Sequence, residues 1–235
     1  MKIGLATYSF INKDIDFNLS QIQKAMQESD VDTDVLCFGE AFLQGFEVLS
    51  NVYEIDAKLA VTQDSAIMDR IKKWSLDYQV GVMFGYIEKD QNYLYSSYIF
   101  IDEGEIKHHY RRTSEGWKEK DKTDEHYKEG NNTSPFKYKG YHCNIVLCGD
   151  GWCTPEKFVC KDVLFWPVYV NFREEMWESE KYEYAKQAIK MCNKCVLVNS
   201  ISKDPQAIGG AFYFENGEIK KESGYDIEDI LYIEI

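Results

Sequence analysis

A cysteine follows a short apolar run near the middle of the chain, where a strand should give way to a helix. Residues 145–147 are apolar, Cys148 comes next, and Gly149 and Asp150 follow it. We expect a buried strand that delivers Cys148 to a turn, with a helix beginning near Thr154. The backbone N–H groups of such a turn and the positive end of the helix favour a thiolate. The pattern is typical of a cysteine nucleophile.

The alternative for this cysteine is a place in the core. The chain has seven cysteines, and free cysteine is among the most buried residue types. Their odd number and their positions in apolar segments predict reduced thiols rather than a disulfide framework. Cys192 and Cys195 have the spacing of a metal or redox pair, but no second pair lies at the distance that a zinc site needs. The four histidines form no metal triad, so we expect neither metal nor cofactor.

A carboxylate occupies a matching place upstream. A short apolar run from Val35 ends on Gly39 and Glu40. Ligands of open α/β sheets gather at the carboxyl ends of strands, so Glu40 should lie where substrate binds. Phe38 and Phe42 flank it and should partly desolvate it, which suits a general base. The alternative is a glutamate that only caps the end of a strand.

With both sites in view, the chain resembles the nitrilase, or carbon–nitrogen hydrolase, superfamily. The resemblance runs through almost the whole length, and its order and spacing are more specific than any single motif. It implies an αββα sandwich that acts on a non-peptide C–N bond, with Glu40 as base and Cys148 as nucleophile. The motifs that carry it are Ile3–Tyr8, the strand ending in Glu40, Tyr110–Arg112 after a hairpin, Cys148–Asp150 with Pro155 and Glu156, Phe165–Pro167, Ala185–Ala188 with Asn193, Val198 and Asn199, and Gly209–Gly217 before a final strand.

The third residue of the family's catalytic set departs from the pattern. The family's lysine ends a Tyr-Arg-Lys segment, and this sequence has Arg112 there. An arginine keeps a positive charge near a developing oxyanion but cannot hand a proton to a leaving amine. Lys118 follows shortly after Gly116 and could supply the ammonium by a shifted route. Lys118 could equally be one solvated lysine of the charged run 118–122, so the sequence leaves Arg112 and Lys118 as open alternatives.

The resemblance also suggests how the rest of the pocket is built. The backbone N–H of Gly149 should hold the oxyanion together with the cation. Relatives commonly have an aromatic residue directly after the cysteine, so the missing side chain at Gly149 should open the pocket. Trp152 and Trp166 are the aromatic residues that we expect to line it.

Length and charge limit the possible partners. The 235 residues fit one carbon–nitrogen hydrolase domain, residues 1–235. The formal net charge of −13, without a basic cluster, argues against nucleic acid. No apolar run is long enough to span a bilayer, and the N-terminus lacks a signal-peptide pattern. We therefore expect a cytoplasmic protein with no membrane partner.

Periodicity predicts the elements that position these residues. Apolar residues at helical spacing indicate helices over about 17–29, 63–78 and 174–191. Residues 93–101 and 105–110 predict a hairpin around a turn at 102–104. We therefore expect mixed sheets with helices outside. The long charged segment 113–134 should be a lid or a substrate-facing loop rather than a domain boundary.

The resulting hypothesis is a hydrolase of a small-molecule amide, omega-amide or carbamoyl compound that works through a thioester on Cys148. Two alternatives remain open. One is a ligand-binding relative that has lost the family lysine and with it turnover. The other is an acyltransferase that uses the same residues and resolves the thioester with an amine. The resemblance also implies a homodimer formed by the helices that follow Cys148.

Overall fold

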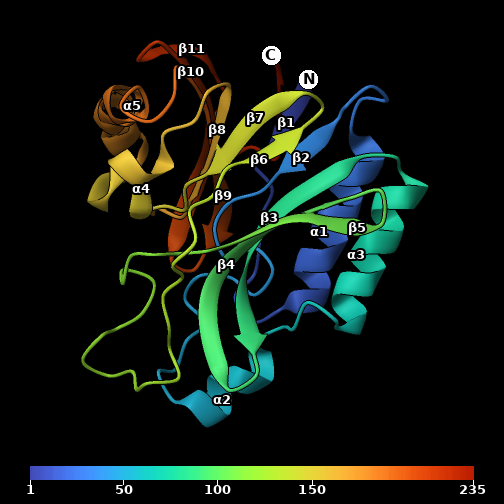
Figure 1. The fold of residues 1–235 in the computed structure, drawn as a ribbon, viewed down its shortest axis with the longest axis vertical. Coiled ribbons are helices and arrows are strands. Elements are labelled where there is room, and N and C mark those ends of the chain that lie inside the picture. The colour runs from blue at the N-terminus through green and yellow to red at the C-terminus, as the bar shows by residue number, and fades with distance from the viewer.

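Two six-stranded sheets form the centre of the molecule, and they lie face to face. The computed structural model describes residues 1–235 (Figure 1). The first sheet contains, in spatial order, β12 (Ile230–Glu234), β1 (Lys2–Ala6), β2 (Val35–Cys37), β3 (Gly81–Asp90), β4 (Tyr93–Asp102) and β5 (Glu105–Arg111). The second contains β11 (Glu218–Glu222), β10 (Gln206–Glu215), β9 (Lys194–Lys203), β8 (Val163–Val168), β7 (Tyr141–Ile145) and β6 (Phe136–Tyr138).

Helices cover the outer face of each sheet. The helices α1 (Ile15–Glu28) and α3 (Ala66–Asp77) lie beside the first sheet, whereas α4 (Asp150–Cys153) and α5 (Glu174–Ala188) lie beside the second (Figure 1). The layers are therefore helix, sheet, sheet and helix, which is the αββα architecture that the resemblance implies. None of the helices is both long and apolar enough to cross a bilayer.

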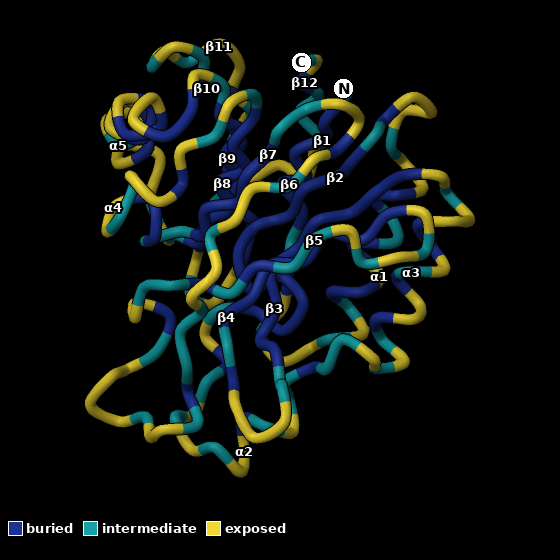
Figure 2. Tube along the Cα trace, viewed as in Figure 1, coloured by how far each residue is buried: buried dark blue, intermediate teal, exposed yellow.

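Alternation along the strands explains how the first sheet is buried on both faces. Val35 and Cys37 belong to the core between the sheets, whereas Leu36 belongs to the cluster under α1 and α3. Successive side chains of a strand point to opposite faces, so an uninterrupted apolar strand fits a doubly covered sheet. The buried parts of the chain accordingly run through the middle of the molecule, and the exposed parts lie on helices and loops (Figure 2).

The long helices lie close to their predicted places, since their ends are set by local signals. The side chain of Asp14 accepts a hydrogen bond from the N–H of Phe17 and caps α1. Ser65 caps α3 in the same way. Between them, α2 (Tyr53–Leu59) was not predicted, because it is short and only one of its seven residues, Asp56, is buried.

The segment after Cys148 differs from the prediction. A short helix, α4, begins at Asp150 rather than near Thr154, and a 3₁₀ turn, η1, follows from Pro155 to Phe158. The apolar strand also ends earlier, since β7 stops at Ile145. The helix therefore begins two residues after Cys148, four residues earlier than predicted.

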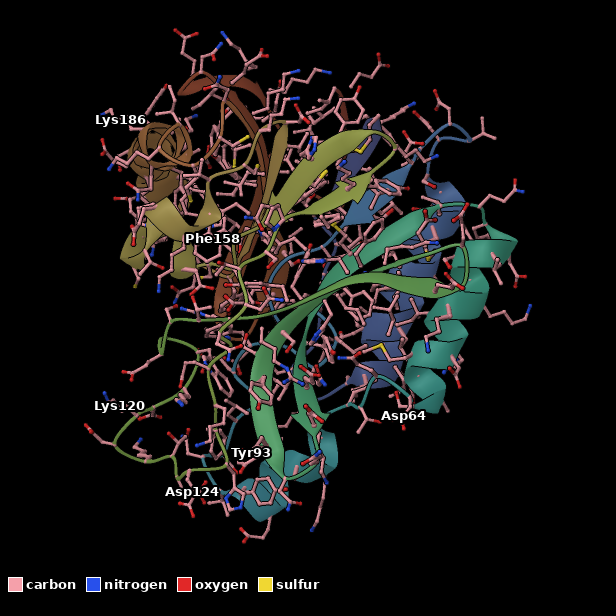
Figure 3. All side chains as sticks on the ribbon, in the orientation of Figure 1. Asp64, Tyr93, Lys120, Asp124, Phe158 and Lys186 are labelled. Atoms are coloured by element: carbon pink, nitrogen blue, oxygen red, sulfur yellow. The ribbon has the colours of Figure 1, made fainter.

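The predicted lid between β5 and β6 is anchored at its base. Leu94 of β4 pairs with Tyr127 in an isolated bridge, and Trp117 is buried against the same apolar cluster. The hydroxyl of Tyr127 donates to buried Asp56 at 2.6 Å, and this carboxylate also accepts from Ser50 and Asn51. Only the outer end of the loop, which carries Lys120 and Asp124, projects away from the sheets (Figure 3).

We predict that Asp56→Ala loosens this loop. The change removes the acceptor of four hydrogen bonds and leaves the buried hydroxyl of Tyr127 without a partner, so the free energy of unfolding should fall by about 3 kcal/mol. Hydrogen exchange over residues 113–134 should become faster, as measured by mass spectrometry. Asp121→Ala, at an exposed position of the same loop, is the matched control. Unchanged exchange in Asp56→Ala would show that the loop is held by other contacts.

Candidate active site

Glu40 lies in the turn after β2, between the two sheets, and is fully buried. Its N–H donates to the carbonyl of Val168 at the end of β8, at 3.2 Å. The neighbouring N–H of Gly39 donates to the hydroxyl of Ser200 on β9, at 3.1 Å. The turn that carries the carboxylate is thus held by strands of the opposite sheet.

The same turn needs a glycine on the neighbouring strand. Ala41 has a left-handed backbone with φ 51°, and a Cβ atom added to Gly85 of β3 would lie 2.2 Å from its nitrogen. The N–H of Gly85 also donates to the carbonyl of Gly39. Any larger residue at position 85 would therefore push Glu40 out of place.

Cys148 lies in a strained turn, and hydrogen bonds hold both its main-chain N–H and its carbonyl. Its φ of 46° is unusual for a residue with a side chain, and such conformations persist where the surroundings enforce them. Its N–H donates to the carbonyl of Pro167 at 2.9 Å. Its carbonyl accepts the indole N–H of Trp166, also at 2.9 Å. Both bonds come from β8, so this strand fixes the cysteine as well as the Glu40 turn.

Arg112 joins the two sites. It directly follows β5 and is 4% exposed. Its Nη1 lies 2.7 Å from Oε1 of Glu40, and its Nε donates to the hydroxyl of Ser114 at 2.9 Å. Its Nη2 makes no hydrogen bond within the protein. The opposite carboxylate oxygen, Oε2 of Glu40, is buried and also has no partner. One oxygen and one nitrogen of the ion pair are therefore free to contact a ligand.

Asp150 aligns the segment of Arg112 with the turn of Cys148. This fully buried carboxylate accepts the hydroxyl of Tyr110 and the N–H groups of Thr113 and Ser114. It also accepts the hydroxyl of Thr113 at 3.0 Å. In the sequence, Asp150 stands out only as part of the motif around Cys148, and its position alone does not indicate this role. The signal that could have found it is a carboxylate two residues after the cysteine, at the end of an apolar run. A carboxylate buried there needs hydrogen-bond donors from the protein.

Charge and burial act against each other at the cysteine. Burial, followed by the negative charge of Glu40, raises the pKa of Cys148 to about 12, although Arg112 acts in the opposite direction. The sequence predicted that the turn would favour a thiolate, and the structure corrects this, because burial beside a carboxylate outweighs the turn and the cation. For Arg112, burial lowers the pKa, but attraction by Glu40, Cys148 and Asp150 outweighs burial and raises it. The resting site holds a neutral thiol beside an ion pair.

Lys118 takes no part in this arrangement. Its ammonium donates to the carbonyl of Tyr127 at 2.6 Å and pairs with Glu129 at 2.6 Å. It contacts neither Glu40 nor Cys148. The loop folds back on itself and uses Lys118 internally, so of the two alternatives only Arg112 reaches the carboxylate.

The two tryptophans pack against each other and against Tyr184 of α5. Trp166 is fully buried, and its ring packs against Trp152 and Tyr184 with centroids 5.8 and 5.0 Å away. Trp152 lies on α4, is 43% exposed and also packs against Tyr184 of α5. Because α4 begins directly after Gly149, the chain has already turned into the outer helical layer at residue 152. The pocket-lining role predicted for both is not seen.

Gly149 has a free donor and a close neighbour. Its N–H has no acceptor within the protein. The sequence suggested an open space beside Gly149, but Nη2 of Arg112 fills this space. A Cβ atom added to Gly149 would lie 2.6 Å from that nitrogen. The N–H of Gly149 and the guanidinium of Arg112 therefore lie close together beside the turn that carries Cys148.

Comparisons with known proteins agree with this architecture. The family model described as carbon-nitrogen hydrolase matches residues 2–159. The chain belongs to the carbon–nitrogen hydrolase family. An (R)-stereoselective amidase from Pseudomonas sp. is 24% identical over 150 residues, which cover 64% of this chain and 52% of that protein. The chain thus spans about half the length of this curated relative.

Solved structures share the fold of this carbon–nitrogen hydrolase at low identity. An amidase from Nesterenkonia sp. AN1 superposes with a TM-score of 0.82 at 15% identity, covering 100% of this chain and 90% of that one. A CN-hydrolase superfamily protein from Xanthomonas campestris gives a TM-score of 0.81 at 14% identity, covering 99% and 89%. These likenesses confirm the αββα sandwich.

We predict that alkylation of Cys148 keeps rising with pH well into the alkaline range. A raised pKa leaves little thiolate at neutrality, so the iodoacetamide rate should still climb above about pH 9, where a free thiol with a pKa of about 8.5 levels off. Glu40→Gln removes a charge that raises this pKa and should move the profile to lower pH. Peptide mass spectrometry measures both. A wild-type profile that levels off below about pH 8 would contradict this electrostatic account.

Proposed function

We propose that this carbon–nitrogen hydrolase is a thiol-dependent amidase that cleaves a small-molecule amide through a thioester on Cys148. The observation that carries the proposal is the buried pair of Glu40 and Arg112 beside the cysteine. The pair leaves Oε2 of the carboxylate and Nη2 of the guanidinium without protein partners. An acceptor and a donor on opposite ends of one ion pair suit a proton transfer and an oxyanion.

In the first step, Glu40 acts as general base. Oε2 takes the thiol proton as sulfur attacks the amide carbonyl, so a C–S bond forms and the carbonyl oxygen becomes an oxyanion. The N–H of Gly149 and Nη2 of Arg112 hold this oxyanion. Because the pKa of Cys148 is raised, proton transfer accompanies attack rather than preceding it. The high pKa is then compatible with catalysis, since the base lies beside the thiol.

In the second step, the C–N bond breaks and the amine leaves. Its proton comes from the carboxyl group of Glu40, because a guanidinium does not give up a proton near neutral pH. Water then attacks the thioester, again with Glu40 as base, and the acid leaves as the thiol regains its proton. Arg112 thus contributes charge alone, and a single carboxylate handles every proton.

The relatives support the substrate class. The Pseudomonas relative is an (R)-stereoselective amidase. A variant of the Nesterenkonia amidase shows covalent addition of the acetamide moiety of fluoroacetamide at its active-site cysteine. We therefore favour small amides over nitriles as substrates of this chain. Transfer of the acyl group to an amine would use the same residues and differ only in the final nucleophile.

A ligand-binding protein without turnover is the second candidate. It is favoured by the guanidinium at the family's lysine position and by the diversion of Lys118 to Glu129. Such a protein would keep the buried ion pair and bind amides without cleaving them. Acyl-enzyme formation separates the two candidates, since only the enzyme forms a thioester.

We predict that Arg112, not Lys118, is needed for turnover. Cys148→Ala should abolish hydrolysis in a panel of small amides, measured as ammonia release. Arg112→Met should lower kcat by about 10²–10³, the usual cost of losing an oxyanion donor. Lys118→Met, a matched loss of a cation that contacts only the loop, should keep kcat within about threefold of wild type. The reverse order of effects would return the role to Lys118.

We also propose a homodimer through the outer face of α4 and α5. Trp152, Met176 and Tyr182 are 43%, 45% and 53% exposed on these helices. These exposed apolar side chains lie on the two helices that follow Cys148, the part of the chain through which the family resemblance implies a dimer. We predict that the double variant Met176→Glu with Tyr182→Glu is a monomer in analytical ultracentrifugation, whereas the wild type is a dimer. The control is Val31→Glu, at an exposed apolar position between α1 and β2, which should leave the dimer intact. A monomeric wild type would contradict the proposal.

A further inference from the structure

We propose that Gly149 and Gly116 are positioning residues whose missing side chains make room for the guanidinium of Arg112. This inference rests on the proposed function of Arg112 as the cation beside Cys148. It explains two departures from the family pattern by one cause. An arginine stands where relatives have lysine, and a glycine stands where relatives commonly have an aromatic residue after the cysteine.

The two glycines approach the same atom of the arginine. A Cβ atom added to Gly149 would lie 2.6 Å from Nη2, and one added to Gly116 would lie 2.8 Å from it. Real Cβ atoms do not come this close to another heavy atom, so either substitution must displace the guanidinium. Nη2 therefore lies in a slot between the cysteine turn and the loop after β5.

Neither glycine is required by its backbone. Gly149 has φ −62° and ψ −19°, which is right-handed helical and open to any residue. Gly116 also lies outside the left-handed region, in contrast to Gly45 with φ 90° and Gly209 with φ 73°. Space is thus the remaining reason for glycine at both positions.

The guanidinium cannot simply swing out of the way. Its Nη1 is held by Glu40 at 2.7 Å and its Nε by Ser114 at 2.9 Å. Because the group is planar, moving Nη2 rotates the whole fork and strains both bonds. An alanine at position 149 would therefore weaken the ion pair and move positive charge away from Cys148. An ammonium, which has one nitrogen instead of a fork, would leave the slot empty.

The test is a double-mutant cycle between positions 149 and 112. The variants are Gly149→Ala, Arg112→Lys and the double variant, and the probe is the rate of Cys148 alkylation by iodoacetamide over a pH series. In the arginine background we expect Gly149→Ala to slow alkylation at about pH 8 by about tenfold, as a rise of one pKa unit would. In the lysine background we expect less than about a threefold effect.

Two controls remove trivial explanations. Gly224→Ala adds a Cβ at another glycine without positive φ, near only Ile227, and should leave the rate unchanged. Gly149→Ser adds the same Cβ with a residue that helix N-caps favour, so an effect shared with alanine does not come from capping. Thermal denaturation of each variant reports folding. If Gly149→Ala does not fold, Gly116→Ala replaces it, since it approaches the same Nη2 from the loop.

The outcomes separate this inference from the proposed function. A large effect with Arg112 and a small one with lysine supports the positioning role, even in a protein that hydrolyses no amide tested. The same factor in both backgrounds overturns the positioning role, even in a protein that is an active amidase. A downward shift of the pH profile in Gly149→Ala also overturns it, because the guanidinium would then not have moved away from the thiol.

Discussion

The ion pair of Glu40 and Arg112 is the constraint on which the rest of the site depends. Both side chains are almost wholly buried, at 0% and 4% exposure, so each charge needs the other. Removing one partner of such a pair typically costs about 3–5 kcal/mol, because an uncompensated charge stays behind. The fold therefore has to bring both residues to one place. The turn after β2 carries Glu40, and the end of β5 carries Arg112. The carboxylate of Asp150 accepts hydrogen bonds from the segment after β5 and so keeps that segment aligned with the turn of Cys148.

The face-to-face sheets make this delivery possible. Val168 and Ser200, from the second sheet, hold the backbone of the Glu40 turn, which belongs to the first. Pro167 and Trp166 hold the backbone of Cys148. Glu40 and Cys148 thus share β8 as a common support, although they are more than a hundred residues apart in the chain. A shift of one sheet against the other would disturb both residues together.

Much of this could be predicted from the sequence, because the signals were local. Apolar periodicity located α1, α3 and α5, and the ends of apolar runs marked Glu40 and Cys148. The contest between Arg112 and Lys118 could not be settled in this way, because it depends on how a long loop closes on Glu129 and Tyr127. The raised pKa of Cys148 was also out of reach, since burial and the charge of Glu40 come from tertiary packing. The sequence likewise suggests open space beside Gly149, because Arg112, which fills that space, is distant in sequence.

The central claim is that a guanidinium at position 112 supplies the positive charge beside Cys148. The most direct test is chemical rescue of Arg112→Ala, with Cys148 alkylation by iodoacetamide as the readout and no substrate needed. The account predicts that alkylation slows by at least about tenfold, one pKa unit, and that added guanidinium salt restores it where equal sodium chloride or methylammonium does not. An alkylation rate in Arg112→Ala equal to that of the wild type would contradict the account.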